Sequence, residues 1–187
     1  MGAVPREAFV AEADRSRAYG DHPLPIGAGQ TISQPYIVAR MTELLEVGPG
    51  DRVLDVGTGS GYQAAVLAEL GCRVTSVERD AGLAREAQDR LGRLDYGDRV
   101  TVEVGDGSLG WPAGAPWDGI LVAAGAPKVP DELRVQLRDG RLLVIPVGTR
   151  RQQELLVVTR HGSEFTERSD GACVFVPLLG EAGWREG

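Results

Sequence analysis

A glycine-rich segment, Asp55-Val56-Gly57-Thr58-Gly59-Ser60-Gly61-Tyr62, has the residue types that bind a nucleotide-like ligand. It lies between a strand-forming run and a helix-forming run, where backbone N–H groups lack helical partners and glycines let a ligand approach closely. A tight turn that binds nothing would use the same glycines, so the cluster alone leaves both interpretations open. The acidic residues that follow the neighbouring strands favour a ligand.

Three acidic residues come at the ends of three successive predicted strands. Asp55 ends the first strand, and Glu78 ends the second, 23 positions later, where a carboxylate accepts hydrogen bonds from a ribose diol. Asp106 follows the third strand in Gly105-Asp106-Gly107. Ligands of open α/β sheets bind at this carboxyl edge, so we expect the three residues to meet there. Taken alone, Glu78 is equally consistent with a solvated carboxylate.

The spacing of the segment restricts the class of ligand. A dinucleotide fingerprint needs Gly or Ala where this chain has Tyr62, which argues against a nicotinamide-dependent oxidoreductase. The segment lacks the Lys and Ser/Thr that end a phosphate loop, and Asp55 would repel a triphosphate. Ser60 lacks the flanking glycines of a hydrolase nucleophile elbow. An adenosine compound with a cationic end and no phosphate, such as S-adenosylmethionine, fits best.

The elements around this segment alternate between short β-branched runs and helical runs, as in an α/β fold with a doubly wound, mostly parallel sheet of about seven strands. We predict strands at 52–56, 73–78, 99–104, 119–123 and 141–147, and helices at 62–70, 81–94 and 131–137, the last ending at Gly140. A further amphipathic helix begins at Pro35 and runs to Leu45. The tail, 154–160, 164–168 and 173–178, is predicted to add antiparallel strands at one sheet edge.

Length and composition indicate one domain with no general affinity for polyanions. The 187 residues include 20 Lys plus Arg against 27 Asp plus Glu, a net charge of −7 that disfavours nucleic acid and anionic membranes. We expect a single domain over 1–187: a cap and substrate segment (1–50), a cofactor-binding core (51–148) and C-terminal strands (149–187). The charged N-terminus lacks a signal-peptide core, which favours the cytoplasm. We expect a monomer without a metal site.

Longer motifs carry a resemblance to a known family. The segments Val4-Pro5-Arg6-Glu7-Ala8-Phe9-Val10 and Leu24-Pro25-Ile26-Gly27-Ala28-Gly29-Gln30-Thr31-Ile32-Ser33-Gln34-Pro35, together with the glycine-rich segment, are similar to those of protein-L-isoaspartate O-methyltransferases. Matches at Gly105-Asp106-Gly107, Pro146-Val147-Gly148 and Phe175-Val176-Pro177-Leu178 continue in order. The resemblance implies a Rossmann-like S-adenosylmethionine-dependent methyltransferase fold.

This resemblance also implies a reaction and its residues. The methyl group of S-adenosylmethionine would pass to the α-carboxylate of an L-isoaspartyl residue in a damaged protein or peptide, and the ester would close to a succinimide, which starts repair. The family's active-site serine corresponds to Ser33. The cofactor would contact, by the same resemblance, Thr31, Ile32, Asp55, Gly57, Thr58, Gly59, Ser60, Gly61, Glu78, Asp106 and Gly107, with Glu78 at the ribose and Asp106 with Gly107 at the adenine.

Alternatives remain for the substrate and for Ser33. A related methyltransferase could act on an aspartate of a natural-product precursor peptide, and a non-catalytic S-adenosylmethionine-binding protein would keep the same loop. Ser33 lies two residues before Pro35, so its hydroxyl could instead cap the helix that begins there. A hydrolase triad of Ser33 with His22 and Asp21 is disfavoured, because no oxyanion motif accompanies it.

Overall fold

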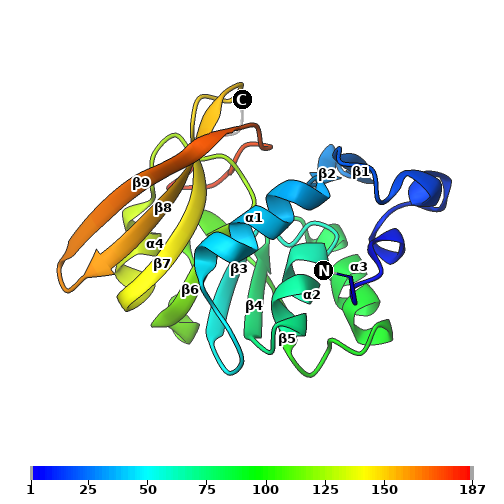
Figure 1. Ribbon diagram of the computed structural model, residues 1–187, viewed down its shortest axis with the longest axis horizontal. Helices are drawn as coiled ribbons and strands as arrows, with labels where there is room; N and C mark the ends of the chain where they lie inside the picture. Colours follow the sequence, from blue (N-terminus) through cyan, green and yellow to red (C-terminus); the bar gives the residue numbers. More distant parts are fainter. Residues whose placement is uncertain (1, 186–187) are drawn as a thin grey trace.

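The computed structural model of the chain describes residues 2–185. Seven strands form the main sheet in the order β5-β4-β3-β6-β7-β8-β9 (Figure 1). Their bounds are β3 (Arg52–Val56), β4 (Arg73–Glu78), β5 (Val100–Val104), β6 (Trp117–Val122), β7 (Leu137–Gly148), β8 (Gln153–His161) and β9 (Glu164–Cys173). The strands β3 to β7 run parallel, whereas β8 and β9 are antiparallel additions. The predicted fold class is confirmed.

The order of the strands reverses next to β3, which is the first strand of the parallel sheet. Along the chain, β4 and β5 are added on one side of β3, and β6 and β7 are added on the other. In open α/β sheets, the loops at such a reversal diverge and leave a crevice at the carboxyl ends of the strands. The glycine-rich segment directly follows β3 and therefore lies at this crevice.

Helices cover the sheet on both faces. The helices α1 (Pro35–Leu45), α2 (Tyr62–Glu69) and α3 (Ala81–Arg93) lie against one face (Figure 1). Their apolar side chains pack in one cluster with Val53, Val74 and Val144. The short helix α4 (Asp131–Gln136) buries Leu133 in a second cluster on the opposite face. This alternation of strand residues between the two clusters follows from the period of two in a β-strand.

Two short 3₁₀ helices and a β-hairpin precede α1. The 3₁₀ helices η1 (Arg6–Phe9) and η2 (Glu12–Arg17) lead into strands β1 (Leu24–Gly27) and β2 (Gln30–Ile32), which pair antiparallel. Two further 3₁₀ turns, η3 (Gly107–Leu109) and η4 (Pro112–Gly114), follow β5. No strand was predicted in the Gly- and Pro-rich stretch 24–32, so the hairpin was missed, and its tip residues Gly27, Ala28 and Gly29 all have positive φ. Two glycines around one alanine were the available signal.

The predicted boundary between α4 and β7 is wrong. The helix ends at Gln136, and Leu137 is already extended and paired with Trp117. Gly140, interpreted as a helix cap, lies inside β7 with φ 73°, where the register of the β6–β7 pairing shifts. Glycines with positive φ occur both at helix ends and at β-bulges, so the presence of glycine at position 140 did not distinguish these two structures.

The predicted strand at 173–178 is also wrong. Strand β9 continues through Ser169-Asp170-Gly171, which lie between two of the predicted strands, because a bulge opposite the stretch from Glu154 to Leu156 absorbs the extra residues. Beyond Cys173 the chain leaves the edge of the sheet. There it makes two isolated bridges, one between Pro177 and Gly125 in the loop after β6 and one between Leu179 and Trp184 of the segment itself. This C-terminal segment therefore crosses the end of the sheet where the glycine-rich segment lies.

Candidate active site

A cavity of about 370 Å³ lies at the carboxyl ends of the central strands. Its walls come from the β1–β2 hairpin, the start of α1, the glycine-rich segment, the end of β4 and the segment after β9. Nine of the predicted site residues line it: Thr31, Ile32, Ser33, Gly57, Thr58, Gly59, Ser60, Glu78 and Gly107. Asp55, Gly61 and Asp106 are outside this lining, each for its own structural reason.

The glycine-rich segment turns sharply from β3 into α2. Gly57, Gly59 and Gly61 have φ of 92°, 51° and 88°, a region that favours glycine. The N–H of Gly57 donates to the carbonyl of Val77 at 2.9 Å, which fastens the start of the turn to β4. Gly61 is the N-cap of α2 and packs on the side chain of Leu91 rather than facing the cavity.

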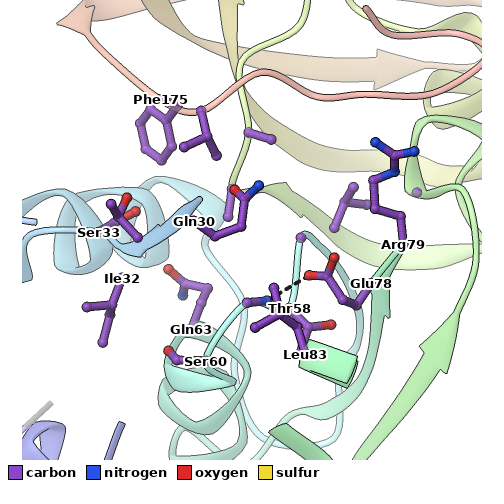
Figure 2. A pocket seen from close by; sticks show the side chains of 18 of the residues that line it. Gln30, Ile32, Ser33, Thr58, Ser60, Gln63, Glu78, Arg79, Leu83 and Phe175 are labelled. Atoms are coloured by element: carbon purple, nitrogen blue, oxygen red, sulfur yellow. Dashed lines mark hydrogen bonds between the residues drawn. The ribbon is translucent and has the colours of Figure 1, made fainter. Parts of the chain in front are cut away.

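Glu78 shapes the glycine-rich segment as well as lining the cavity. One carboxylate oxygen, Oε2, accepts from the N–H of Gly59 at 2.9 Å, and Oε1 accepts from the N–H of Asp80 at 3.1 Å (Figure 2). The side chain is buried, yet each carboxylate oxygen has a second lone pair for a ligand donor. Glu78 thus stands where the sequence placed it, at the end of β4.

Asp55, the first residue of the glycine-rich segment, lies in β3 behind the turn that the glycines form, and it is completely buried. Its Oδ2 accepts from Ser76 Oγ at 2.7 Å, and its Oδ1 has no hydrogen-bond partner. Thr58 Oγ1 lies 2.6 Å from Ser76 Oγ, and because Ser76 gives its only hydroxyl proton to Asp55, Thr58 is the donor. Burial, with a smaller contribution from Glu78, raises the pKa of Asp55 to about 7.

Ser33 lines the cavity and does not cap α1. The N-cap residue is Gln34, without a side-chain capping bond, and Asp21 Oδ1 accepts from the N–H of Tyr36 at 3.0 Å. Asp21 therefore supplies from a distant loop the capping bond that the sequence allowed for Ser33. In Figure 2, Ser33 and Phe175 lie at one end of the cavity and Glu78 lies at the other.

Asp106 points its carboxylate at the C-terminal segment. Its Oδ1 accepts from Ser108 N at 2.9 Å and from Ser108 Oγ at 2.6 Å, and its Oδ2 accepts from the N–H of Glu181 at 2.7 Å. Its neighbour Gly107 does line the cavity. A Cβ on Gly107 would lie 2.6 Å from Val56 Cγ1, so only glycine fits against the end of β3.

Several lining residues were not anticipated. The hairpin contributes Ala28 and Gln30, α2 contributes Gln63, and the C-terminal segment contributes Phe175, Val176, Pro177 and Leu179. Gln63 was detectable as a polar residue in an otherwise apolar helix; it is buried, and its Nε2 donates to Thr42 Oγ1 at 2.9 Å. The C-terminal residues matched a family motif, but nothing local to them indicated that they reach this cavity.

Comparison with known proteins supplies the family. A family model described as Protein-L-isoaspartate(D-aspartate) O-methyltransferase matches residues 1–183. The chain belongs to the protein-L-isoaspartate O-methyltransferase family. A family member from Marinobacter nauticus is 57% identical over 186 residues, covering 98% of this chain and 84% of that protein. Another from Methanopyrus kandleri is 54% identical over 190 residues, covering 100% of this chain and 84% of that protein.

Solved structures agree with the protein-L-isoaspartate O-methyltransferase assignment. One, named protein-L-isoaspartate O-methyltransferase, superposes with a TM-score of 0.87 at 28% identity; the match covers 96% of this chain and 60% of that longer chain. A second, described as a beta-aspartate methyltransferase from Plasmodium falciparum in complex with S-adenosyl-L-homocysteine, has a TM-score of 0.76 at 26% identity, covering 95% of this chain and 87% of that one.

Residues 2–185 contain neither a candidate metal-binding cluster nor a candidate membrane-spanning helix. In that range, no three His, Cys, Asp or Glu side chains are grouped so that they could hold a metal ion. Nor does any helix there have the length and apolar character needed to cross a membrane.

Proposed function

We propose that this chain transfers the methyl group of S-adenosylmethionine to the α-carboxylate of L-isoaspartyl residues in proteins and peptides, the step that starts their repair. The observation that carries the proposal is that one cavity joins the glycine-rich segment and Glu78 to Ser33. Membership of the family supports the same reaction.

The cavity suits S-adenosylmethionine in size and in charge. Its volume of about 370 Å³ lies in the range of small-molecule sites. Glu78 and Asp80 line it together with Arg79, and the buried carboxylate of Glu78 supplies negative charge for a cationic ligand. Because Gly57 and Gly59 have no Cβ atom, a ligand can approach the backbone closely at these two positions.

The proposed cofactor roles follow the family resemblance, and the positions of the lining residues are consistent with them. Glu78 would hold the ribose hydroxyls, and Gly107 would face the adenine. Thr31, Ile32 and the glycine-rich segment would enclose the remainder of the ligand. Asp55 would act from behind the turn, through Ser76 and Thr58, instead of touching the ligand directly.

The methyl transfer requires that the substrate carboxylate be positioned, and it does not require a general base. When bound, S-adenosylmethionine supplies a methyl group activated by a positively charged sulfur. The α-carboxylate of an isoaspartyl residue is ionised at neutral pH, so no side chain has to remove a proton from it. Ser33 would donate a hydrogen bond to one carboxylate oxygen and leave the other directed at the methyl group.

Amides at the start of α1 contribute less to this positioning than a helix N-terminus usually could. Pro35 has no N–H, and the N–H of Tyr36 is bonded to Asp21. The hydroxyl of Ser33 is therefore the main group proposed to position the substrate carboxylate. The resulting methyl ester would close to a succinimide unaided, because methoxide leaves more readily than hydroxide.

We also propose that the chain works as a cytoplasmic monomer, which its net charge of −7 favours by keeping copies apart.

The test uses labelled S-adenosylmethionine and two peptides that differ only in carrying Asp or isoaspartate at one position. We expect label on the isoaspartyl peptide alone, released as methanol at mildly basic pH. Ser33→Ala is the matched control for label that does not depend on the site. Equal labelling of both peptides, or of neither, would contradict the proposed substrate.

A further inference from the structure

The last part of the chain forms one wall of the cofactor cavity. Residues 174–185, here called the C-terminal strap, follow β9, and Phe175, Val176, Pro177 and Leu179 of the strap line the cavity. In Figure 1 this segment is the red chain that continues from β9. The position of this wall therefore depends on the contacts that hold the strap.

The strap is fastened at its beginning by the loop after β6 and by β8. The N–H of Phe175 donates to Gln153 Oε1 at 2.7 Å. Main-chain bonds of 2.8 Å join Gly125 N to the carbonyl of Val176, and Leu178 N to the carbonyl of Gly125. Beyond Leu178, Trp184 Nε1 also donates to the carbonyl of Gly125 at 3.0 Å, and residues between Leu178 and Trp184 have partners in another loop.

At its far end, the strap is held by side chains of the loop after β5. Asp106 Oδ2 accepts from the N–H of Glu181 at 2.7 Å, and Ser108 Oγ accepts from the N–H of Ala182 at 3.0 Å. Ser108 in turn donates to Asp106 Oδ1 at 2.6 Å. A methyl group on Gly180 would overlap both Asp106 Oδ1 and Ser108 Oγ, so the close approach requires glycine. We call Asp106, Ser108 and Gly180 the latch.

The latch joins two walls of the cavity. Gly107 lies between the two latch residues of its loop and lines the cavity on one side, and Leu179 precedes Gly180 and lines it on the other. Both walls therefore depend on the same carboxylate. A carboxylate that already accepts three hydrogen bonds, one of them from the strap, is committed to holding the loop and the strap together.

We propose that the latch holds the C-terminal strap closed against the cofactor, and that Asp106, Ser108 and Gly180 are positioning residues for cofactor binding. The inference rests on the proposed function, since it takes the ligand of the cavity to be S-adenosylmethionine. It differs from the role that sequence resemblance gave Asp106, because Asp106 acts through Gly107 and Leu179 and not through a contact of its own.

Gly180→Ala tests the latch without changing any residue that lines the cavity. Glu181→Ala is the control, because it alters the neighbouring exposed side chain and keeps the N–H that Asp106 accepts. Calorimetry with S-adenosylhomocysteine should show about tenfold weaker binding for Gly180→Ala, the loss expected for a broken hydrogen-bonded contact, and no change for Glu181→Ala. In steady-state assays, KM for S-adenosylmethionine should rise by the same factor while kcat at saturation stays within about twofold.

Hydrogen exchange provides a second readout that general destabilisation would not produce. In Gly180→Ala, amides of 174–185 should exchange faster than in the parent, whereas amides of β3 and β4 should not. Ser108→Ala, which removes one acceptor without adding bulk, should weaken binding severalfold and decides the question if Gly180→Ala does not fold.

The outcomes separate the two proposals. A parent protein that does not bind S-adenosylhomocysteine would contradict the proposed function. A parent that binds it, with Gly180→Ala and Ser108→Ala binding equally well, would leave the function intact and overturn the latch.

Discussion

Replacing Asp55 with Asn should change how the stability of the ligand-free protein depends on pH. The Asp55 carboxyl is fully buried, and only one of its oxygens has a hydrogen-bond partner, Ser76. Burial is the largest cause that raises its pKa to about 7, and the hydrogen bond from Ser76 opposes the shift without cancelling it. Folding therefore favours the protonated form of this side chain.

The direction and size of the effect follow from the two pKa values. In the unfolded chain, an aspartate ionises near roughly 3.9. Between that pH and about 7, the unfolded state has lost the proton while the folded state keeps it, so stability falls as pH rises. The loss is absent below the unfolded pKa and complete above the folded one. At about 1.4 kcal/mol per pH unit, the full interval corresponds to roughly 4 kcal/mol.

Urea unfolding of the parent and of Asp55→Asn at pH 5, 6, 7 and 8 measures this directly. Because Asn cannot ionise, the stability of the variant relative to the parent should rise by about 1.4 kcal/mol per unit from pH 5 to 7 and level off by pH 8. Asp98→Asn, at an exposed position, controls for the change in net charge. A relative stability that stays constant from pH 5 to 7 would refute the reasoning and show that Asp55 is already ionised at pH 5.

Three further predictions concern the active site. Ser33→Ala should lower turnover roughly 10- to 100-fold through loss of one positioning hydrogen bond, with unfolding by urea unchanged, whereas Asp21→Ala should cost about 1 kcal/mol of stability as a lost helix cap. Glu78→Ala should weaken S-adenosylmethionine binding in calorimetry by roughly 1 to 3 kcal/mol; unchanged affinity would contradict its role. Single-turnover methyl transfer should be nearly flat from about pH 6 to 8, and a tenfold rise abolished by His22→Gln would reveal a base.

The parallel core was predictable because its signals are local. Strand β3, the glycine-rich segment and α2 follow one another in the chain, and their residue types already indicate a strand, a turn with positive φ and a buried helix. Glu78 could be added because the carboxyl ends of adjacent parallel strands meet at the same edge. Glu78 and four predicted site residues of the glycine-rich segment consequently line one cavity, whereas Thr31, Ile32 and Ser33 were expected from the family resemblance.

The parts that were not predictable depend on long-range partners. Phe175 and Leu179 form a wall of the cavity in a segment whose hydrogen-bond partners, among them Gln153, Gly125 and Asp106, lie far away in the sequence. The sequence around these residues contains no periodicity that indicates such partners, and a strand was predicted instead. Gly180 shows the same limit, since its need for glycine comes from Asp106, 74 positions earlier in the chain.

The hydrogen bonds around the start of α1 distinguish two roles that the sequence leaves open for Ser33, a helix cap and a residue that faces the substrate. A serine just before a proline-initiated helix is a common cap, and the same serine in the family motif faces the substrate. The first N–H of α1 that needs a partner, on Tyr36, is taken by Asp21, and the N–H of Val38 donates to the carbonyl of Gln34. Within residues 2–185, Ser33 makes no hydrogen bond, so its hydroxyl is free to donate into the cavity that it lines. The helix is thus capped by Asp21, and in the proposed function Ser33 would orient the carboxylate of the substrate, which is why their substitutions should separate stability from turnover.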